Sequence, residues 1–243
     1  MLIAFISDIH GNMPALEAAV ADAKAHGVDR IICAGDMTGY GPFPDDVCDF
    51  LRREGIQGIR GNYDQKVIDV AEQGASATAG MKKKKRKILL WTVDKISEKT
   101  QLFLSGLPDF LDLQLPGKKT IHVFHGSPLS VNDAIYPSIT RYGLEMKLRD
   151  TRPDILVCGH THIPFVKHVG GILVVNCGSV GNPVDGDPRP AYALVRSEPG
   201  AMPRGHIVRF KYDWNQTIEE LGRTALPKGL QKDFAEGNKR RFL

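Results

Sequence analysis

The chain has 243 residues, 42% of them hydrophobic and 25% charged, and a formal net charge of +4. This composition is typical of an ordinary globular protein, and the length allows one substantial core, so we expect a single domain over residues 1–243. No apolar run approaches the roughly 18 residues that a membrane span needs. The N-terminal apolar stretch is too short for a signal peptide and runs straight into Asp8, so we expect a cytoplasmic protein.

One basic cluster accounts for the positive net charge. Residues 82–87 read Lys-Lys-Lys-Lys-Arg-Lys, so the rest of the chain is slightly acidic. A single local cluster is not a basic face, which argues against general nucleic-acid binding. We interpret residues 82–87 as a solvated helix face, with a docking surface for acidic substrates as the alternative.

The cysteines give no sign of a disulfide framework or a zinc site. None of the four is part of a Cys-x-x-Cys pair, and they are scattered over expected strands and a helix. We therefore predict buried free thiols. The four residues are Cys33, Cys48, Cys158 and Cys177.

The first quarter of the chain alternates strands with helices. Expected strands begin at Ile3 and cover residues 30–36 and 56–61, and expected helices lie between them at about 14–26 and 44–54. Short joints between these elements imply parallel strands with right-handed crossovers. Ligand sites in such sheets lie beyond the carboxyl ends of the strands.

The remainder is richer in strands. Residues 65 to about 108 predict a helical insertion beside the site, and residues 213 to 243 a helical C-terminal tail. Strands are expected at 110–115, 120–124, 155–158, 165–168, 172–177, 191–196 and 206–212, with helices at about 138–150 and 215–224.

Five expected strands in succession end in side chains that can bind a metal ion. Asp8 and His10 come first, and because residues two apart on a strand share a side, we expect them to project together. Each such residue has an ordinary structural explanation, since Asp and Asn favour turns and a single His usually has a structural role. Their recurrence beside glycines at equivalent strand ends is what predicts a site. The full set is Asp8, His10, Asp36, Asn62, His125, His160 and His162.

These motifs, in this order, resemble the calcineurin-like metallophosphoesterase family. More narrowly, the chain is similar to small prokaryotic phosphodiesterases and diadenosine-tetraphosphatase-related members. The resemblance spans roughly residues 2 to 212 and implies an α/β fold, a four-layer αββα sandwich of two mixed β-sheets flanked by helices. The motifs are Asp8-x-His10, Gly35-Asp36, Gly61-Asn62-Tyr63-Asp64, Phe124-His125-Gly126 and Gly159-His160-Thr161-His162, followed by Gly178–Pro183 and Asp187–Arg189.

The resemblance also implies two divalent metal ions. Two divalent ions carry four positive charges, of which the two carboxylates offset two. About two positive charges then remain to bind a hydroxide and a phosphoester oxygen. Mixed nitrogen and oxygen ligands suit Mn, Fe, Zn or Ni better than Mg or Ca, and we expect manganese first. The implied ligands are Asp8, His10, Asp36 and His162 for one ion and Asp36, Asn62, His125 and His160 for the other, with Asp36 bridging.

The function implied is a dinuclear metal-dependent phosphoesterase. It would hydrolyse phosphodiesters, with phosphomonoesters as a further class, by direct attack of a metal-bound hydroxide on a small phosphorylated substrate. One alternative is a dinucleoside polyphosphate or nucleotide hydrolase. The second alternative is a non-catalytic interaction module on the same fold. The presence of all seven ligand residues favours the enzyme, and the sequence leaves the oligomeric state open.

Tyr63 departs from the commonest family pattern, which has His between the Asn and the acidic residue. A phenol with a pKa near 10 is poorly matched to acid catalysis at pH 7. We therefore expect weak dependence on a general acid and a bias towards activated leaving groups, with a packed aromatic as the alternative for Tyr63.

The remaining candidates support the site from outside the ligand set. Asp64 is expected to fix the orientation of a ligand, and Arg189 to contact substrate phosphate unless it is a plain loop residue. The backbone of Gly178–Gly181 either presents N–H groups to an anion or forms a structural turn. The predicted catalytic residues are Asp36, Asn62, Tyr63, Asp64 and His125, and the predicted substrate contacts are Asn62, Tyr63 and Arg189.

Overall fold

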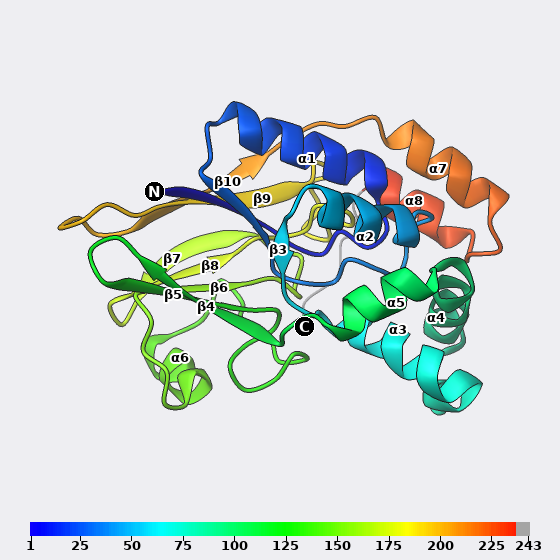
Figure 1. The fold of residues 1–243 in the computed structure, drawn as a ribbon, viewed down its shortest axis with the longest axis horizontal. Helices are drawn as coiled ribbons and strands as arrows, with labels where there is room; N and C mark the ends of the chain where they lie inside the picture. The colour runs from blue at the N-terminus through cyan, green and yellow to red at the C-terminus, as the bar shows by residue number, and fades with distance from the viewer. Residues whose placement is uncertain (237–243) are drawn as a thin grey trace.

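A computed structural model of the chain describes residues 1–236 and contains two five-stranded sheets packed face to face (Figure 1). The first sheet consists of β1 (Leu2–Ile6), β2 (Arg30–Cys33), β3 (Gln57–Gly58), β9 (Ala191–Arg196) and β10 (Arg204–Arg209). The second consists of β4 (Phe110–Leu115), β5 (Lys119–Phe124), β6 (Ile155–Cys158), β7 (Phe165–Val169) and β8 (Ile172–Asn176).

Both sheets are mixed. The first has the order β10-β9-β1-β2-β3, in which β1, β2 and β3 are parallel and β9 runs against them. The second has the order β4-β5-β6-β8-β7. Its central strands β5, β6 and β8 are parallel, and the edge strands β4 and β7 run antiparallel to their neighbours. The expected sandwich of two mixed sheets is confirmed.

Helices cover the outer faces of both sheets (Figure 1). Those associated with the first sheet are α1 (Met13–Ala25), α2 (Pro44–Arg53), α7 (Trp214–Arg223) and α8 (Gly229–Glu236). The second sheet is covered by α6 (Arg141–Leu148), whose Leu144 and Leu148 pack against Leu156 and Val174. A further group at one end of the sheets comprises α3 (Asn62–Gln73), the short 3₁₀ helix Gly74–Thr78, α4 (Lys83–Lys95) and α5 (Glu98–Ser105).

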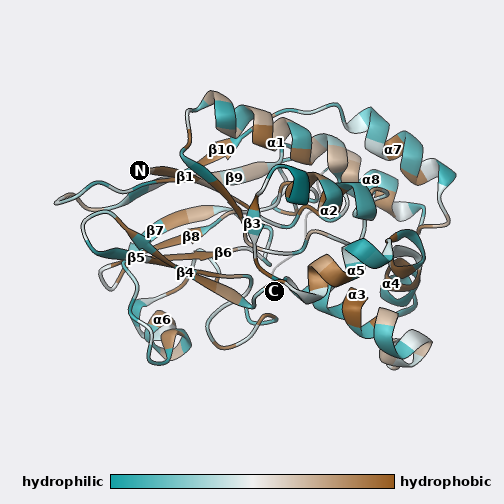
Figure 2. Cartoon of the chain, in the orientation of Figure 1, coloured by the Kyte–Doolittle hydropathy of each residue, from teal (hydrophilic) through white to brown (hydrophobic). Residues whose placement is uncertain are grey.

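Burial on both faces explains why β1 is an uninterrupted apolar run. Its Ile3 and Phe5 belong to the core between the sheets, whereas Ala4 and Ile6 belong to the core under the helices. A strand covered on both sides has no solvent face to keep polar. Figure 2 shows the same division, with brown strands inside the sandwich and teal on the outward helix surfaces. The four cysteines are buried and free, as predicted.

Several boundaries differ from the sequence expectation, including β2, which ends at Cys33 and not at residue 36. β3 is only two residues long, and α3 begins at Asn62, so the expected helical segment starts three residues before residue 65. The last strand covers Arg204–Arg209 and not 206–212. The expected C-terminal tail contains α7 and α8, and its residues 237–243 lie outside the described part. Within residues 1–236, no helix is long and apolar enough to cross a membrane.

Candidate metal centre

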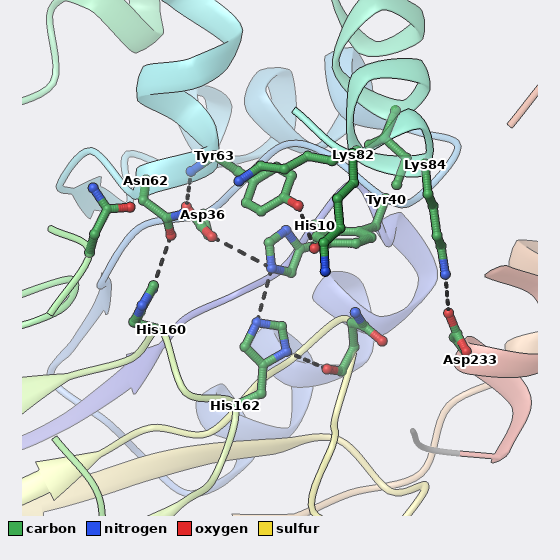
Figure 3. A pocket seen from close by; sticks show the side chains of 14 residues that line it. His10, Asp36, Tyr40, Asn62, Tyr63, Lys82, Lys84, His160, His162 and Asp233 are labelled. Carbon is green, nitrogen blue, oxygen red and sulfur yellow. Dashed lines mark hydrogen bonds and ion pairs between the residues drawn. The ribbon is translucent and has the colours of Figure 1, made fainter. Parts of the chain in front are cut away.

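The seven predicted ligands meet at the carboxyl ends of the strands, and Figure 3 shows five of them, His10, Asp36, Asn62, His160 and His162. His162 Nε2 lies 3.1 Å from Asp8 Oδ1 and 3.1 Å from His10 Nε2. His125 Nε2 lies 3.5 Å from Asp36 Oδ2. Donor atoms from the two sheets therefore converge, although His10 and His162 are 152 positions apart in the chain.

A left-handed backbone places most of these side chains. β1 ends at Ile6, so Asp8 and His10 lie beyond it, and their φ angles are 53° and 50°. The expectation that strand alternation aligns them was therefore wrong, although the two side chains do lie together. Asp36, His160 and His162 share the left-handed backbone, which non-glycine residues rarely adopt without support from their surroundings.

Hydrogen bonds between loops hold this backbone. Asp8 N donates to Gly35 O at 3.0 Å, and His10 N donates to Asp36 O at 3.0 Å. Glycine permits the close approach, since a Cβ on Gly61 would lie 2.1 Å from Asp36 N. The glycines beside the ligands are therefore explained by the contact between loops.

Each carboxylate uses one oxygen for structure and turns the other towards the cluster. Asp8 Oδ2 accepts hydrogen bonds from Ser7 Oγ at 2.7 Å and His160 N at 2.9 Å. Asp36 Oδ1 accepts one from Tyr63 N at 2.7 Å. Asp8 Oδ1 is buried and accepts no hydrogen bond from residues 1–236, and Asp36 Oδ2 faces His10 and His125. Both inward oxygens are thus available to a cation.

Three of the histidines are oriented by backbone carbonyls. A carbonyl only accepts, so each Nδ1 carries the proton in the neutral ring and Nε2 keeps its lone pair for a metal ion. In this form two lone pairs meet at 3.1 Å between His10 and His162, an arrangement that a bound cation relieves. The three pairs are His10 with Thr38 O, His125 with Ala34 O and His162 with Asn182 O.

Asn62 and His160 complete the donor set. The carboxamide of Asn62, at the first position of α3, lies 3.0 Å from both His125 Nε2 and His160 Nδ1. Two groups of donor atoms each lie within 4.8 Å of one another, and Asp8 belongs to both. A buried oxygen without a hydrogen bond, surrounded by imidazole nitrogens, fits a divalent cation. The groups are Asp8, His10 and His162, and Asp8, Asp36 and His125.

The ionisation of the cluster follows from its two carboxylates. Burial opposes their charge, but the neighbouring imidazoles outweigh it and lower the pKa of both Asp8 and Asp36. Burial also opposes a charge on His125, yet Asp36 and Asp8 raise its pKa to about 9. For His10 burial dominates and lowers the pKa to about 4. A proton on His125 therefore offsets part of the buried negative charge when no metal ion is bound.

A cavity of about 480 Å³ opens onto the cluster. His10, Asp36, Asn62, His160 and His162 form part of its lining. The first turn of α4 forms another part through Lys82, Lys84 and Lys85. In Figure 3, Lys82 extends towards the cluster, whereas Lys84 reaches Asp233. The helical segment therefore lies against the site. Lys82 and Lys84 are exposed and Lys85 is half-buried, so this segment is a solvated helix face, one side of which also lines the cavity. Lys83, Arg86 and Lys87 are exposed and do not line the cavity.

Comparison with known families decides the identity. Residues 1–199 match the Calcineurin-like phosphoesterase superfamily domain. The chain belongs to this superfamily. It is therefore a phosphoric ester hydrolase by family, in agreement with the fold and the motif order.

Three relatives cover nearly the whole phosphoesterase. The uncharacterized protein MJ0912 of Methanocaldococcus jannaschii is 31% identical over 94% of this chain and 95% of its own length. Phosphodiesterase YfcE of Escherichia coli is 27% identical over 82% of this chain and 89% of its own. The crystal structure of a metallophosphoesterase from Sphaerobacter thermophilus is 29% identical, covers 98% of this chain and 99% of its own, and superposes with a TM-score of 0.76.

Asp64 links two loops of this phosphoesterase through hydrogen bonds. Its fully buried carboxylate accepts hydrogen bonds from the backbone N–H groups of Gly61, Met37 and Thr38 and from the Thr38 hydroxyl. Burial, assisted by the nearby charge of Asp36, raises the Asp64 pKa to about 6. Asp64 does not line the cavity. It ties the start of α3 to the loop that carries Asp36.

Tyr63 does line the cavity, together with a residue that the sequence did not single out. The hydroxyls of Tyr40 and Tyr63 share a short hydrogen bond, and both rings meet His10 edge-on, with centroids 4.8 Å and 5.4 Å away. Tyr40 has a φ of 61° between two glycines of a strand-to-helix loop. The Gly-Tyr-Gly pattern in the sequence is the feature that could have indicated Tyr40 as a site residue.

The last two motifs of the family resemblance have different places in the structure. Gly178–Pro183 is a structural loop, and Asp187–Arg189 lies away from the cavity. Val180 N donates to Ser7 O and Gly181 N to Asp8 O, so these N–H groups are engaged with the protein. A Cβ on Gly181 would lie 1.7 Å from Ile9 O. The turn interpretation of this loop is therefore supported by its hydrogen bonds.

The structure does not bring Arg189 to the cavity. Its guanidinium forks onto Asp187, with Nη2 2.7 Å from Oδ2, and its side chain is 52% exposed. Arg189 is absent from the cavity lining. A contact between Arg189 and substrate phosphate is therefore without structural support.

Proposed function

We propose that the protein is a dinuclear metal-dependent phosphoesterase that hydrolyses phosphodiester bonds. The observation that carries this proposal is the convergence of seven donor side chains, five of which line an open cavity, around a buried carboxylate oxygen that lacks a hydrogen bond within residues 1–236. One ion would be held by Asp8, His10, Asp36 and His162, and the other by Asp36, Asn62, His125 and His160.

The donor set supplies the chemistry that ester hydrolysis needs. When bound, two divalent cations lower the pKa of water and stabilise charge on the attacking and leaving oxygens of an in-line displacement at phosphorus. The carbonyl-bound imidazoles are already oriented for binding, and so is Asp36 through its bond to Tyr63 N. Little reorganisation of the protein is needed on loading.

The tyrosine pair has a separate role in the proposal. Tyr63 lines the cavity with its hydroxyl bonded to Tyr40, so it can donate a hydrogen bond to a phosphoryl oxygen while Tyr40 holds its orientation. A phenol is a poor proton donor to a leaving group at neutral pH. The proposed enzyme therefore favours esters with activated leaving groups.

One observation favours a second candidate, a dinucleoside polyphosphate or nucleotide hydrolase. The cavity of about 480 Å³ falls within the range of small-molecule sites, and part of its lining is cationic. Such a substrate would share the same metal ions and the same bond-breaking chemistry.

We also propose that residues 1–243 form a single domain with a helical insertion at about 65–108. The hydrophobic cluster beneath α1 supports this, because it includes Leu2 and Phe234 from opposite ends of the described chain. Residues of the insertion, Ile88 and Leu104 among them, belong to the same cluster.

The proposal is tested by an activity screen of the metal-reconstituted protein. Protein stripped with EDTA is reloaded with Mn²⁺, and in parallel with Zn²⁺ or Ni²⁺, and assayed on bis(p-nitrophenyl) phosphate, p-nitrophenyl phosphate, nucleotides and dinucleoside polyphosphates. We expect hydrolysis of the diester that EDTA abolishes and metal restores. The ratio of bound metal to protein, measured by mass spectrometry, should approach two.

Two outcomes would contradict the proposal in different ways. A chain that binds no transition metal would overturn the ligand assignment. A chain that binds two ions and hydrolyses none of these esters would support the non-catalytic interaction module.

A further inference from the structure

The first turn of α4 carries several cations in positions that destabilise the helix. Lys82 is the N-cap residue and offers no side-chain acceptor to the N–H groups that begin the helix. No acidic residue lies in the first turn, whereas α2 carries Asp45 and Asp46 there. Because a helix N-terminus is electropositive, several lysines at this end destabilise the helix.

Like charges within the same turn add to this cost. Side chains three or four positions apart on a helix are neighbours, so Lys83 faces Arg86 and Lys87 with the same sign of charge. An anion beside the first turn would offset the cost of placing lysines at this helix end. Free N–H groups, the helix dipole and ammonium groups together form an anion-binding site.

The lysines that line the cavity are poorly neutralised. Lys84 Nζ lies 2.9 Å from Asp233 Oδ2 of α8, as Figure 3 shows. Lys82 and Lys85 have no carboxylate partner among residues 1–236, and Lys85 Nζ lies 5.4 Å from the centroid of the Tyr63 ring. Outside the metal ligands, three ammonium groups thus face one carboxylate across the cavity.

The position of these cations relative to the metal ligands sets what they can bind. Both groups line one continuous cavity, so a single molecule can reach both. The Lys85 ammonium lies over the ring of Tyr63, and Tyr63 N donates a hydrogen bond to Asp36. The lysines of the first turn are therefore next to the proposed metal ligands in the cavity. A phosphoryl group held by the metal ligands leaves this turn free for another anionic group of the same molecule.

We propose that the first turn of α4 is a second anion subsite, which binds a further phosphoryl group of the substrate. This rests on the proposed function, because the metal ligands hold the group that reacts. The preferred substrates are then polyphosphorylated esters, and simple diesters with one negative charge use only half of the site.

Binding to the metal-free protein tests the subsite independently of catalysis. Inorganic tripolyphosphate is titrated into EDTA-treated protein by calorimetry, which avoids chelation of the catalytic ions. The test variant is Lys82→Met with Lys85→Met, and the matched control is Lys83→Met with Lys87→Met. Both remove two charges from the same helix, but only the first pair lines the cavity.

We expect tripolyphosphate to bind at least tenfold more weakly to the test variant and within twofold of wild type to the control. Equal losses in both variants would show a general charge effect and overturn the subsite, as would wild-type protein that does not bind. Thermal melts establish that both variants are folded.

A kinetic measurement separates this subsite from the proposed function. In the Mn²⁺-loaded enzyme, the ratio of kcat/KM for adenosine 5′-tetraphosphate to that for bis(p-nitrophenyl) phosphate should fall at least tenfold in the test variant only. An unchanged ratio would overturn the subsite. If no ester is hydrolysed by wild-type protein, the proposed function fails while the calorimetry still decides the subsite.

Discussion

The loops that carry the proposed metal ligands and the first turn of α4 border the same cavity but are built in opposite ways. The ligand loops are largely buried, five of the seven proposed ligands have a left-handed backbone, and backbone hydrogen bonds join the loops to one another. The first turn of α4 is a regular helix end with exposed or half-buried lysines, two of which have no carboxylate partner within residues 1–236.

This difference separates two functions of one site. Positions that set chemistry tolerate little movement, because an ion demands fixed donor geometry. Positions that select substrates by charge need only a local excess of cations, since Coulomb attraction is long-ranged and weakly directional. Substitutions in the ligand loops should therefore change metal binding and turnover, and substitutions in the first turn of α4 should change the preference for charged substrates.

The largest effect is expected at Asp36. Replacing it in Asp36→Asn removes the one carboxylate proposed to bridge both ions and should lower turnover on the order of 1,000-fold. Metal content, measured by mass spectrometry, should fall with it. The exposed Asp109→Asn is the control, because it removes the same charge outside the cavity. An Asp36→Asn enzyme that keeps its metal and activity would show that the ligand assignment is wrong.

A glycine beside the ligands tests whether the loops are rigid. In Gly61→Ala the new Cβ would lie 2.1 Å from both Asp36 N and Asp36 Oδ1, so the loop must move. We expect a loss of about 1–3 kcal/mol in the free energy of unfolding, together with weaker metal binding. Gly229→Ala is the control, because its Cβ would meet open space. Equal stability of the two variants would show that the ligand loops are not rigid.

Tyr63 lies at the boundary between the two regions. Because a phenol is a weak acid at neutral pH, Tyr63→Phe should lower kcat less than 100-fold on p-nitrophenyl esters. Tyr40→Phe should cause a similar loss, since the two hydroxyls are bonded to each other. A decrease of 100-fold or more would show that the hydroxyl contributes directly to bond cleavage.

The smallest expected effect is the release of a proton when the metal site is loaded. His125 has a pKa of about 9 and is charged at pH 7.5, whereas His10, with a pKa of about 4, is already neutral. Loading with Mn²⁺ should therefore release about one proton from His125, and this release should disappear as the pH rises past about 9. Calorimetry in two buffers of different ionisation enthalpy measures it, and identical heats in both would contradict the prediction.

Much of the fold could be predicted from the sequence. Alternating strands and helices predicted the parallel half, and the family resemblance supplied the second sheet. Acidic, amide and imidazole side chains at successive strand ends predicted a metal site because parallel strands bring their carboxyl ends to one edge. The side chains of Asp8 and Asp36 do converge there.

Other features depend on contacts that no local pattern encodes. The left-handed backbone at Asp8 and His10 arises from bonds to the loop after β2, so strand alternation gave a wrong reason for their proximity. Tyr40 matters through its contact with Tyr63. The role of Lys82 depends on how α4 packs against the cavity, since the same lysines on another face would only meet solvent.

The left-handed backbone at five of the ligands has a consequence for engineering. Such residues cost on the order of 1 kcal/mol each, and glycine adopts the same conformation freely. Glycine at His160, whose side chain is only partly buried, should thus raise the melting temperature of the metal-free chain while removing a proposed metal ligand. A programme that selected variants for heat tolerance alone would tend to erase the active site, so screening for thermostability in this protein must be paired with an assay of turnover.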